Sequence, residues 1–487
     1  MDLHKQHDQQ ENGRSVVQQL ISKARTAQRK FERCSQAEVD EAVLAAGWAI
    51  MDPNRNRALA EMAVRDTGLG NVEDKVTKNF RKTLGLLRDL RGVKTVGVVA
   101  EYPERGLVEI ARPVGVVAAI TPSTNPGATP ANKIINALKC RNAVIVAPSP
   151  KGLSTCLALV GYIHAELTRI GLPPDLVQCL PSPITKEATQ ELMKQADLVV
   201  ATGSQNNIRA AYTSGTPAFG VGAGNVASII DLSANLTEAS LAIAASKTFD
   251  NATSCSSENS AVILDGVYSD AMTALKAAGG VLLSDVEKAK LQAVMWPNGK
   301  LASIVTAQLA PRIAELAGLT GERFAKGRFL MVEETGAGPD YPFSGEKLSP
   351  VLTVYRAADF NAACQLVSDI YAYQGAGHSV GVHSQDDANI LRLGLELPVC
   401  RVIVNQAHCF ATGGAFDNGL PFSLSMGCGT WGGNNFSDNM SFRQYMNITR
   451  ISRKIPPRMP TEEELFGEYL KRHGLQGSDS LNRKTST

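Results

Sequence analysis

VGVVAAITPSTNPGATPANKIINALKCRNAVIVAP, residues 114–148, specifies the first strand–helix–strand unit of the chain. Two short apolar runs, 114–120 and 142–148, are rich in Val, Ile and Ala. Between them, a loop containing Pro and Gly leads into a segment, 129–139, that we expect to be helical. This order of elements predicts a parallel βαβ unit.

The same alternation continues along the chain. Three further apolar runs read as buried strands, at 176–181, 198–202 and 226–231, and helices are expected at 153–170 and 186–195. Repeated strand–helix–strand units predict a parallel sheet with helices on both faces. We therefore expect an α/β fold with a Rossmann-type nucleotide-binding domain.

Other segments flank this domain. Apolar residues at helical spacing predict a helix over 16–31, and further helices are expected at 38–50 and 71–90. A Pro-Glu-Arg-Gly turn predicts a hairpin that pairs 96–102 with 107–112. A second α/β stretch begins near residue 238, with strands expected at 258–264, 347–356 and 401–406.

These elements predict four regions. The cofactor-binding domain is expected over 1–95 and 113–232, and an α/β catalytic domain over 233–433. The hairpin 96–112 and the segment 434–454 are expected to form a small β arm for oligomerisation. The tail 455–487 is expected to hold one short helix from residue 462 and a disordered polar end.

The composition excludes several classes of protein. With 44% hydrophobic and 20% charged residues and a formal charge of +2, the chain is typical of an ordinary globular protein, without support for nucleic-acid or anionic-membrane binding. The polar first residues do not form the apolar core of a signal peptide, and no apolar stretch is long enough to span a bilayer. Nine scattered cysteines without CxxC spacing argue against a disulfide framework or a zinc or other metal site, and favour the cytoplasm.

One of these cysteines, Cys255, lies in FDNATSCSSENS, residues 249–260. The surrounding serines and Asn251 can donate hydrogen bonds to a thiolate, and a strand follows directly. Its position at the edge of an element is one where functional side chains gather. The simpler alternative is an incidental cysteine in a polar loop.

Several spaced motifs favour a catalytic role for Cys255. TNP (124–126), ATGS (201–204), GVGAGN (220–225), the Cys255 loop, EKLSP (346–350) and GCGTWGGN (427–434) occur in the order used by the aldehyde dehydrogenase superfamily, which the chain resembles from about residue 16 to 452. NVEDKVTKN (71–79), VAPSPK (146–151) and YQGAGHSVGVH (373–383) are similar to its CoA-acylating branch. Within that branch the chain most resembles the acylating sulfoacetaldehyde dehydrogenases.

The resemblance implies a reaction. Cys255 attacks an aldehyde, a hydride leaves to a nicotinamide, and a thioacyl-enzyme remains. Asn125 and the backbone N–H of Cys255 would stabilise the oxyanion. Asn125 also fits a simpler role as a turn residue before Pro126. The expected substrate is a small aldehyde, best sulfoacetaldehyde, with succinate semialdehyde, acetaldehyde or propionaldehyde as alternatives.

A nicotinamide cofactor is also implied. Gly203 and Ser204 lie between a strand and a helix, where a helix N-terminus suits a phosphate. By resemblance, the cofactor-binding residues are Thr121, Pro122, Ser149, Gly203, Ser204, Gly222, Gly224 and Glu346. Ala147–Pro148 stands where non-acylating relatives carry a ribose-binding lysine, and no acid nearby would repel a 2′-phosphate. Either NAD or NADP is therefore allowed, with NADP favoured.

Val221 points to coenzyme A as the second substrate. By resemblance, hydrolytic relatives carry at this position the glutamate that activates water, and a valine cannot act as a general base. The thioester would then be cleaved by the thiol of coenzyme A. The alternatives are a hydrolytic aldehyde dehydrogenase that uses another base, and a Cys-dependent acyltransferase without a redox step.

The same resemblance implies roles for further residues. His378 could carry the proton of the coenzyme A thiol. His408 is expected to touch the substrate, and Arg112 and His408 are candidates for binding an anionic tail. The arms resemble those that pair subunits in this superfamily, which predicts a homodimer or homotetramer.

Overall fold

The computed structural model describes residues 2–476, with side chains from residue 13 onward. The predicted disordered end, 477–487, lies outside the described residues. The chain divides into two compact units. The first runs to Val96 and continues over Arg112–Asn447, and the second comprises Gly97–Ala111 and the chain from Ile448.

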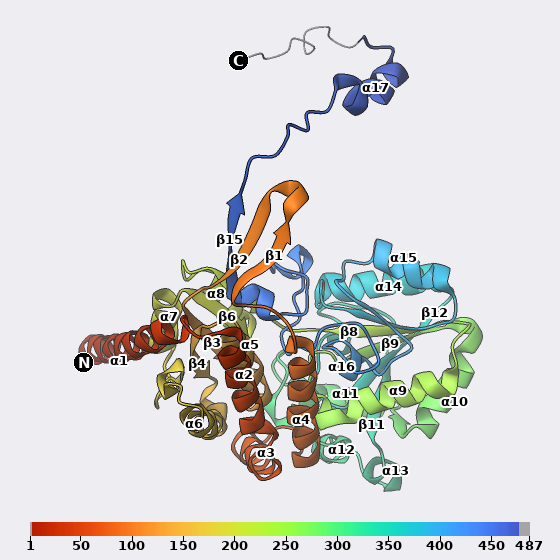
Figure 1. Cartoon of the computed structure of the whole chain (residues 1–487). Helices are drawn as coiled ribbons and strands as arrows, with labels where there is room; N and C mark the ends of the chain where they lie inside the picture. Colours follow the sequence, from red (N-terminus) through yellow and green to blue (C-terminus); the bar gives the residue numbers. More distant parts are fainter. Residues whose placement is uncertain (1, 477–487) are drawn as a thin grey trace. The chain divides into compact units, whose positions relative to one another are not determined.

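The chain begins with four helices of the first unit (Figure 1): α1 (Asp2–Phe31), α2 (Gln36–Met51), α3 (Pro53–Thr67) and α4 (Val72–Leu90). Ser35 starts α2 through a capping box with Glu38, and the Asn71 side chain caps α4 by accepting from Asp74 N–H. The helices predicted at 16–31, 38–50 and 71–90 are confirmed. The structure adds α3, which the spacing of apolar residues does not predict.

A five-stranded sheet forms the first core of the unit. Its strands are β3 (Val116–Thr121), β4 (Ala143–Pro148), β5 (Val177–Cys179), β6 (Leu198–Thr202) and β7 (Ala218–Val221). They lie in the order β5-β4-β3-β6-β7, and all pairs are parallel. This is the Rossmann order, which confirms the predicted domain type.

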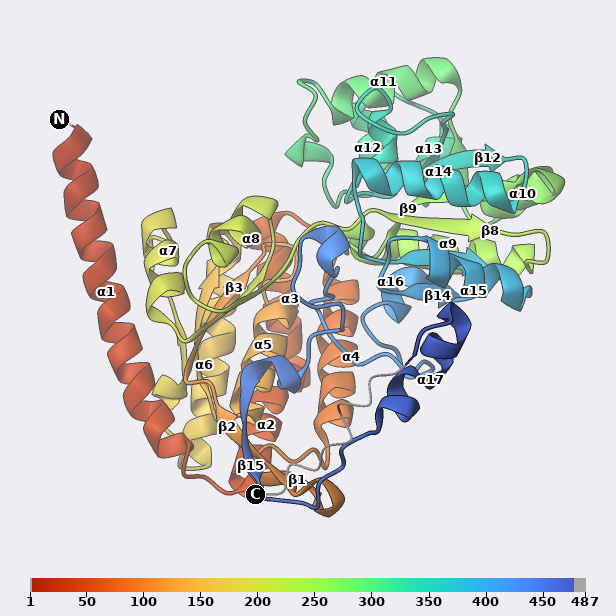
Figure 2. The same cartoon turned by 90° about the horizontal axis from the view of Figure 1, so that it is seen from above.

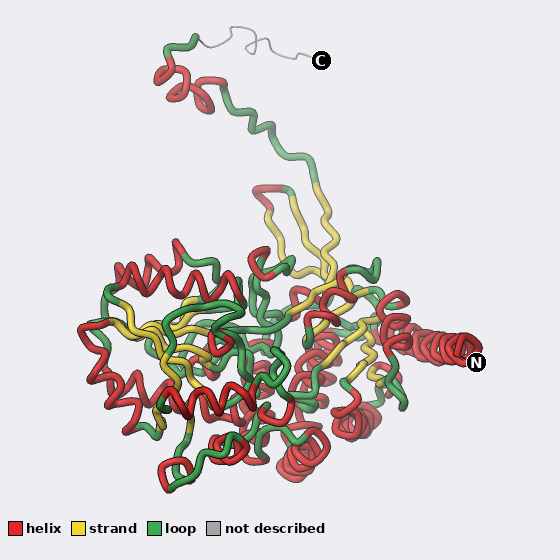
Figure 3. The backbone as a smooth tube through the Cα atoms, turned by 180° about the vertical axis from the view of Figure 1, so that it is seen from behind, coloured by secondary structure: helices red, strands yellow, loops and turns green. Residues whose placement is uncertain are grey.

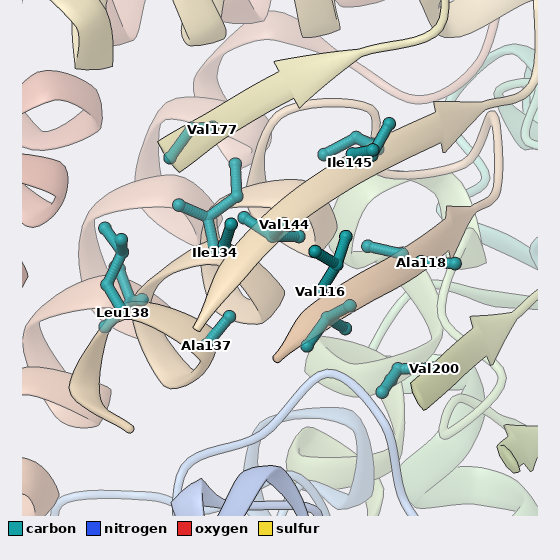
Figure 4. Packing of buried hydrophobic residues seen from close by; sticks show 14 of the residues in the cluster. Val116, Ala118, Ile134, Ala137, Leu138, Val144, Ile145, Val177 and Val200 are labelled. Carbon is teal, nitrogen blue, oxygen red and sulfur yellow. The ribbon is translucent and has the colours of Figure 1, made fainter. Parts of the chain in front are cut away.

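Helices cover this sheet (Figure 2): α5 (Ala128–Lys139), α6 (Leu153–Arg169), α7 (Lys186–Gln195) and α8 (Gln205–Tyr212). Every residue of α5 is buried. Its Ile134, Ala137 and Leu138 pack with Val144 and Val177 of the strands (Figure 4). Burying this apolar surface, at about 25 cal/mol per Å², holds the loop between β3 and α5 in place.

A seven-stranded parallel sheet forms the second core. Its strands are β8 (Val226–Ile230), β9 (Glu258–Leu264), β10 (Gly280–Leu282), β11 (Phe329–Glu333), β12 (Val351–Ala357), β13 (Val380–His383) and β14 (Val402–Val404). Their order is β10-β11-β12-β9-β8-β13-β14. The helices of this part are α9 (Leu236–Thr248), α10 (Tyr268–Ala277), α11 (Asp285–Met295), α12 (Ala310–Leu316), α13 (Glu322–Ala325), α14 (Phe360–Tyr373), α15 (Asp387–Glu396) and α16 (His408–Ala411).

The structure corrects the boundary between the two α/β domains. The strand at 226–230 was assigned to the cofactor-binding domain, which was expected to end at residue 232. It instead pairs with β9 and β13 of the seven-stranded sheet. The passage between the two sheets therefore lies between Val221 and Val226, because hydrogen-bond pairing, and not the local apolar pattern, decides which sheet a strand joins.

The second unit holds a small sheet and a helix. Its sheet has the order β1 (Gly97–Tyr102), β2 (Leu107–Pro113) and β15 (Met446–Ser452), and Figure 3 shows the three strands as a narrow ribbon. β1 and β2 form the predicted antiparallel hairpin. The predicted helix of the tail is α17 (Glu462–His473). The expected arm segment 434–454 falls partly in the first unit, which extends to Asn447.

Candidate active site around Cys255

The candidate residues lie where the strands of the seven-stranded sheet begin and where the strands of the five-stranded sheet end. Around the seven-stranded sheet, each lies just before a strand: Gly224 before β8, Cys255 before β9, Glu346 before β12, His378 before β13 and Arg401 before β14. Because parallel strands begin at one edge, these five residues meet there. Around the five-stranded sheet, Thr121, Ser149 and Ser204 lie at the carboxyl ends of strands, where α/β proteins bind ligands.

The loop that carries Cys255 has an unusual backbone. Asp250, Asn251 and Ala252 have φ angles of 49°, 53° and 59°, in the left-handed region that costs a non-glycine residue about 1–2 kcal/mol. Hydrogen bonds offset this strain, among them one from Asn251 Nδ2 to Ala307 O at 3.0 Å. The turn is thus held in one conformation, which fixes the position of the Cys255 backbone that carries the thiol.

The Cys255 thiol faces a histidine. Its Sγ lies 3.5 Å from Nε2 of His378, and Nδ1 of His378 lies 2.7 Å from Oγ of Ser379. Burial, together with the nearby Glu346 carboxylate, raises the pKa of Cys255 to about 12. Burial and the nearby Arg401 lower the pKa of His378 to about 3. The pair is therefore a neutral thiol and a neutral imidazole at neutral pH, and the Nε2 lone pair faces the thiol when Nδ1–H donates to Ser379.

Arg401, which none of the sequence motifs singles out, supplies positive charge to this pair. Its guanidinium is buried and donates to the carbonyl oxygens of His378 at 3.1 Å, Gly427 at 2.9 Å and Ser437 at 2.9 Å. Its charge favours the thiolate form of Cys255. The sequence signal for it was a single arginine in the apolar run 401–406.

Asn125 is held by a buried ionic network that was also missed. Lys78 Nζ of α4 donates to Asn125 Oδ1 at 2.8 Å, to Asp250 Oδ2 at 2.5 Å and to Thr253 Oγ1 at 3.1 Å. Lys75 Nζ donates to the same Asp250 oxygen at 3.0 Å. Because Lys78 occupies the amide oxygen, the Asn125 NH₂ group is left to donate elsewhere. The network joins the loop of Asn125 to the loop of Cys255.

Gly224 and Glu346 approach the nucleophile from neighbouring loops. Gly224 N–H donates to Glu346 Oε1 at 3.3 Å, and burial raises the pKa of Glu346 to about 8. A Cβ on Gly224 would lie 2.2 Å from the carbonyl oxygen of Cys255, so no side chain fits there. Gly222 lines a cavity of about 320 Å³ with Tyr373 and Trp431.

A larger cavity of about 630 Å³ lies at the carboxyl edge of the five-stranded sheet. Thr121, Ser149 and Ser204 line it, as does Lys186 at the start of α7. Ser204 also caps α8 by accepting from Asn207 N–H. The Thr121 hydroxyl is buried without a hydrogen-bond partner in the described chain, so a ligand hydroxyl or phosphate can bond to it. Size and donors fit the nucleotide part of a nicotinamide cofactor.

The remaining predicted residues occupy other places. Val221 is the buried last residue of β7, with a side chain that offers no base. Gly203 follows β6, and Pro122 follows β3. Neither is among the residues that line the 630 Å³ cavity.

His408 and Arg112, the candidates for contact with the substrate tail, lie in different surroundings. His408 is fully buried, with Nδ1 2.9 Å from Ser256 O and 2.8 Å from Thr412 Oγ1. It thus supports the Cys255 loop. Arg112, a candidate for an anionic tail, is exposed and pairs with Glu32 at 3.2 Å, because a long charged side chain on a strand of the arm remains in solvent.

Comparison with known proteins assigns this geometry to a family. The model of the aldehyde dehydrogenase family matches residues 4–295. The chain is 68% identical to a sulfoacetaldehyde dehydrogenase (acylating) of Cupriavidus necator, over 94% of this chain and 93% of the relative. It is 37% identical to a succinate-semialdehyde dehydrogenase (acetylating) of Clostridium kluyveri, over 93% and 99%. The crystal structure of an acetylating aldehyde dehydrogenase from Geobacillus thermoglucosidasius aligns with a TM-score of 0.89 at 36% identity, over 93% and 99%.

Proposed function

The chain belongs to the aldehyde dehydrogenase family, and from that membership we propose that it oxidises sulfoacetaldehyde to sulfoacetyl-CoA with reduction of NAD(P)⁺. The relative from Cupriavidus necator, by its name a sulfoacetaldehyde dehydrogenase (acylating), supports the substrate. The relative from Clostridium kluyveri, by its name an acetylating succinate-semialdehyde dehydrogenase, supports the acylating chemistry. The reaction is reversible in principle.

Cys255 and His378 begin the reaction. The imidazole Nε2, 3.5 Å from Sγ, accepts the thiol proton as the sulfur attacks the aldehyde carbon. The NH₂ group of Asn125 and the backbone N–H of Cys255 donate to the oxygen that gains negative charge. Lys78 keeps the Asn125 amide oriented by occupying its oxygen at 2.8 Å. The charge of Arg401 partly offsets the burial that disfavours the thiolate.

Oxidation leaves the acyl group on Cys255 as a thioester. A nicotinamide held at the site would supply the hydride acceptor for this step. No carboxylate occupies position 221, since the residue there is a buried valine at the end of β7. Water is therefore not activated from that position, and the thioester persists until the thiol of coenzyme A attacks it. His378, after releasing the first proton to solvent, accepts the proton of that thiol and returns it to the Cys255 sulfur as the sulfur leaves.

We assign NADP as the favoured cofactor. Lys186 lines the 630 Å³ cavity, and the cavity-lining residues of the described chain include no carboxylate. A lysine without an opposing acid suits the additional 2′-phosphate of NADP. Thr121, Ser149 and Ser204 would hold the remainder of the nucleotide through their hydroxyl groups.

We also propose a cytoplasmic homodimer or homotetramer. In the second unit, nearly every residue of β1, β2 and β15 is at least partly exposed. A narrow three-stranded sheet with so little buried surface needs a partner for stability, which a second copy of the chain can provide. All nine cysteines are free thiols, which suits a reducing compartment. Within residues 2–476, no helix combines the length and apolarity needed to cross a membrane.

The observation that carries the proposal is the Cys255–His378 contact beside an Asn125 amide whose oxygen is already engaged. The test is an assay of sulfoacetaldehyde, succinate semialdehyde, acetaldehyde and propionaldehyde with each nicotinamide, with and without coenzyme A. We expect reduction of the cofactor only when coenzyme A is present, with the highest kcat/KM for sulfoacetaldehyde and NADP⁺. Equal steady-state rates without coenzyme A would contradict the proposal.

A further inference from the structure

A second, smaller cavity lies beside the nucleophile and outside the cofactor cavity. It measures about 40 Å³, and both Asn125 and Ser254, the neighbour of Cys255, line it. Aromatic rings of Phe249, Phe410 and Phe422 form part of its wall. The remaining wall is basic: Lys78, Arg81 and Lys82, all from α4, face the same space.

The three cations differ in how their charges are compensated. Lys78 is neutralised by Asp250 at 2.5 Å. Lys82 donates to the carbonyl oxygens of Gly413 at 2.9 Å and Gly414 at 3.1 Å, which are neutral partners, and burial lowers its pKa to about 7. Arg81 lies over the ring of Phe410, 5.1 Å from its centroid.

Neither Arg81 nor Lys82 has an acidic partner. In the part of the chain that the structure describes, no ion pair joins either side chain to a carboxylate, and no acid lines the cavity. Half-buried cations without counter-charges make the free site electrostatically unfavourable. An anion of matching size would relieve this cost. An alkyl aldehyde offers no such compensation.

We propose that this cavity binds the anionic tail of the aldehyde substrate, with Arg81 as the principal ligand of a sulfonate and Lys82 as the second. This inference rests on the proposed function. A sulfonate carries a permanent negative charge on three oxygens, which suits the planar donor fork of arginine. Arg81 and Lys82 lie one turn of α4, about 5.4 Å, beyond the Lys78 that holds Asn125.

The size of the cavity adds a chain-length preference. At about 40 Å³ it accepts a compact head group, so the charged tail must follow the aldehyde carbon closely. Sulfoacetaldehyde has one methylene between the two groups. Succinate semialdehyde has two methylenes and a carboxylate, and it is therefore the poorer substrate of the two.

The test compares two substrates that share the CH₂–CHO group and differ in whether the tail is anionic. Propionaldehyde carries a methyl group where sulfoacetaldehyde carries its sulfonate. With NADP⁺ and coenzyme A saturating, Arg81→Met should lower kcat/KM for sulfoacetaldehyde by about 10²–10³-fold and leave propionaldehyde nearly unchanged. Arg81→Lys, which keeps the charge but loses the planar donor fork, should show a smaller loss than Arg81→Met. The matched control is Arg91→Met, an exposed arginine at the end of the same helix.

A second readout does not depend on turnover of the charged aldehyde. Ethanesulfonate should inhibit propionaldehyde oxidation competitively in the wild-type enzyme, and Arg81→Met should remove that inhibition. Equal losses for both aldehydes in Arg81→Met, or no loss for either, would overturn the assignment of the cavity. So would a wild-type enzyme that oxidises propionaldehyde but not sulfoacetaldehyde, although the acylating function would then stand. Failure of the wild-type enzyme on every aldehyde would instead overturn the proposed function itself.

Discussion

Lys78→Met tests whether the oxyanion amide is held in place by the ionic network of α4. Lys78 Nζ donates to Asn125 Oδ1 at 2.8 Å and to Asp250 Oδ2 at 2.5 Å. Methionine keeps the length of the side chain but removes both bonds, so Asn125 is free to rotate. Complete loss of one oxyanion donor lowers the rate by about 10²–10³-fold, which is the largest effect that Lys78→Met can have through Asn125. We expect a loss of about 10–100-fold in the rate of hydride transfer.

The same substitution also destabilises the fold. Breaking a buried ion pair costs about 3–5 kcal/mol when it leaves a charge unpaired. Asp250 keeps Lys75 at 3.0 Å, so we expect a cost near the lower end, about 3 kcal/mol. Lys75→Met is the matched control, because Lys75 binds the same carboxylate but donates to Thr124 O instead of the Asn125 side chain. It should lower stability similarly and slow hydride transfer much less.

The assay is a single-turnover measurement of reduced cofactor, which separates chemistry from product release. A double-mutant cycle with Asn125→Ala isolates the coupling. Because both substitutions disable the same donor, the double variant should be no slower than Asn125→Ala alone. If the two rate losses multiply, or if Lys78→Met reacts at the wild-type rate, the reasoning about the network is wrong.

Three further predictions concern other parts of the chain. Gly224→Ala should lower kcat by at least tenfold, since its Cβ would lie 2.2 Å from the Cys255 carbonyl oxygen and must displace the loop; wild-type kcat would argue against this close approach. Lys186→Ala should raise KM for NADP⁺ about 5–10-fold while KM for NAD⁺ changes little, and equal effects would remove the assigned phosphate contact. Lys133 is fully buried, and burial lowers its pKa to about 7 from an ordinary value near 10.5. Between these two pH values the unfolded chain binds more protons than the folded chain. The free energy of unfolding therefore rises with pH across that window. Lys133→Met should therefore raise the apparent Tm most at pH 7 or below, with a gain that shrinks toward pH 10, and a gain independent of pH would refute this.

The sequence predicted those elements whose signal is local. The strands around 116–121 and 143–148 are fully buried apolar runs, and the hairpin 97–113 has a clear turn, so both were recognisable. The helix α3 was missed because its polar sequence carries few apolar residues. The strand 226–230 was recognised but placed in the wrong sheet, because an apolar run does not indicate which strands it pairs with.

The residues of the site also divide into those with a local sequence signal and those without one. Cys255 stood out through its polar surroundings and its motif context. The role of Lys78 did not, because its partner Asp250 lies 172 residues away along the chain. The left-handed turn at 250–252 contains no glycine, so the sequence does not indicate its positive φ angles. The sequence does not show where the His408 side chain points; it turns to Ser256 and Thr412, while its neighbours Cys409 and Phe410 line the small cavity.

The central claim is that Cys255 carries a thioester that only coenzyme A resolves. The most direct measurement mixes enzyme, NADP⁺ and sulfoacetaldehyde without coenzyme A, and follows reduced cofactor together with the mass of the peptide that contains Cys255. The account predicts a burst of about one reduced cofactor per chain, then arrest, with the acyl group on Cys255 and renewed turnover once coenzyme A is added. Continued turnover to free sulfoacetate without coenzyme A, or a burst that survives Cys255→Ala, would contradict it.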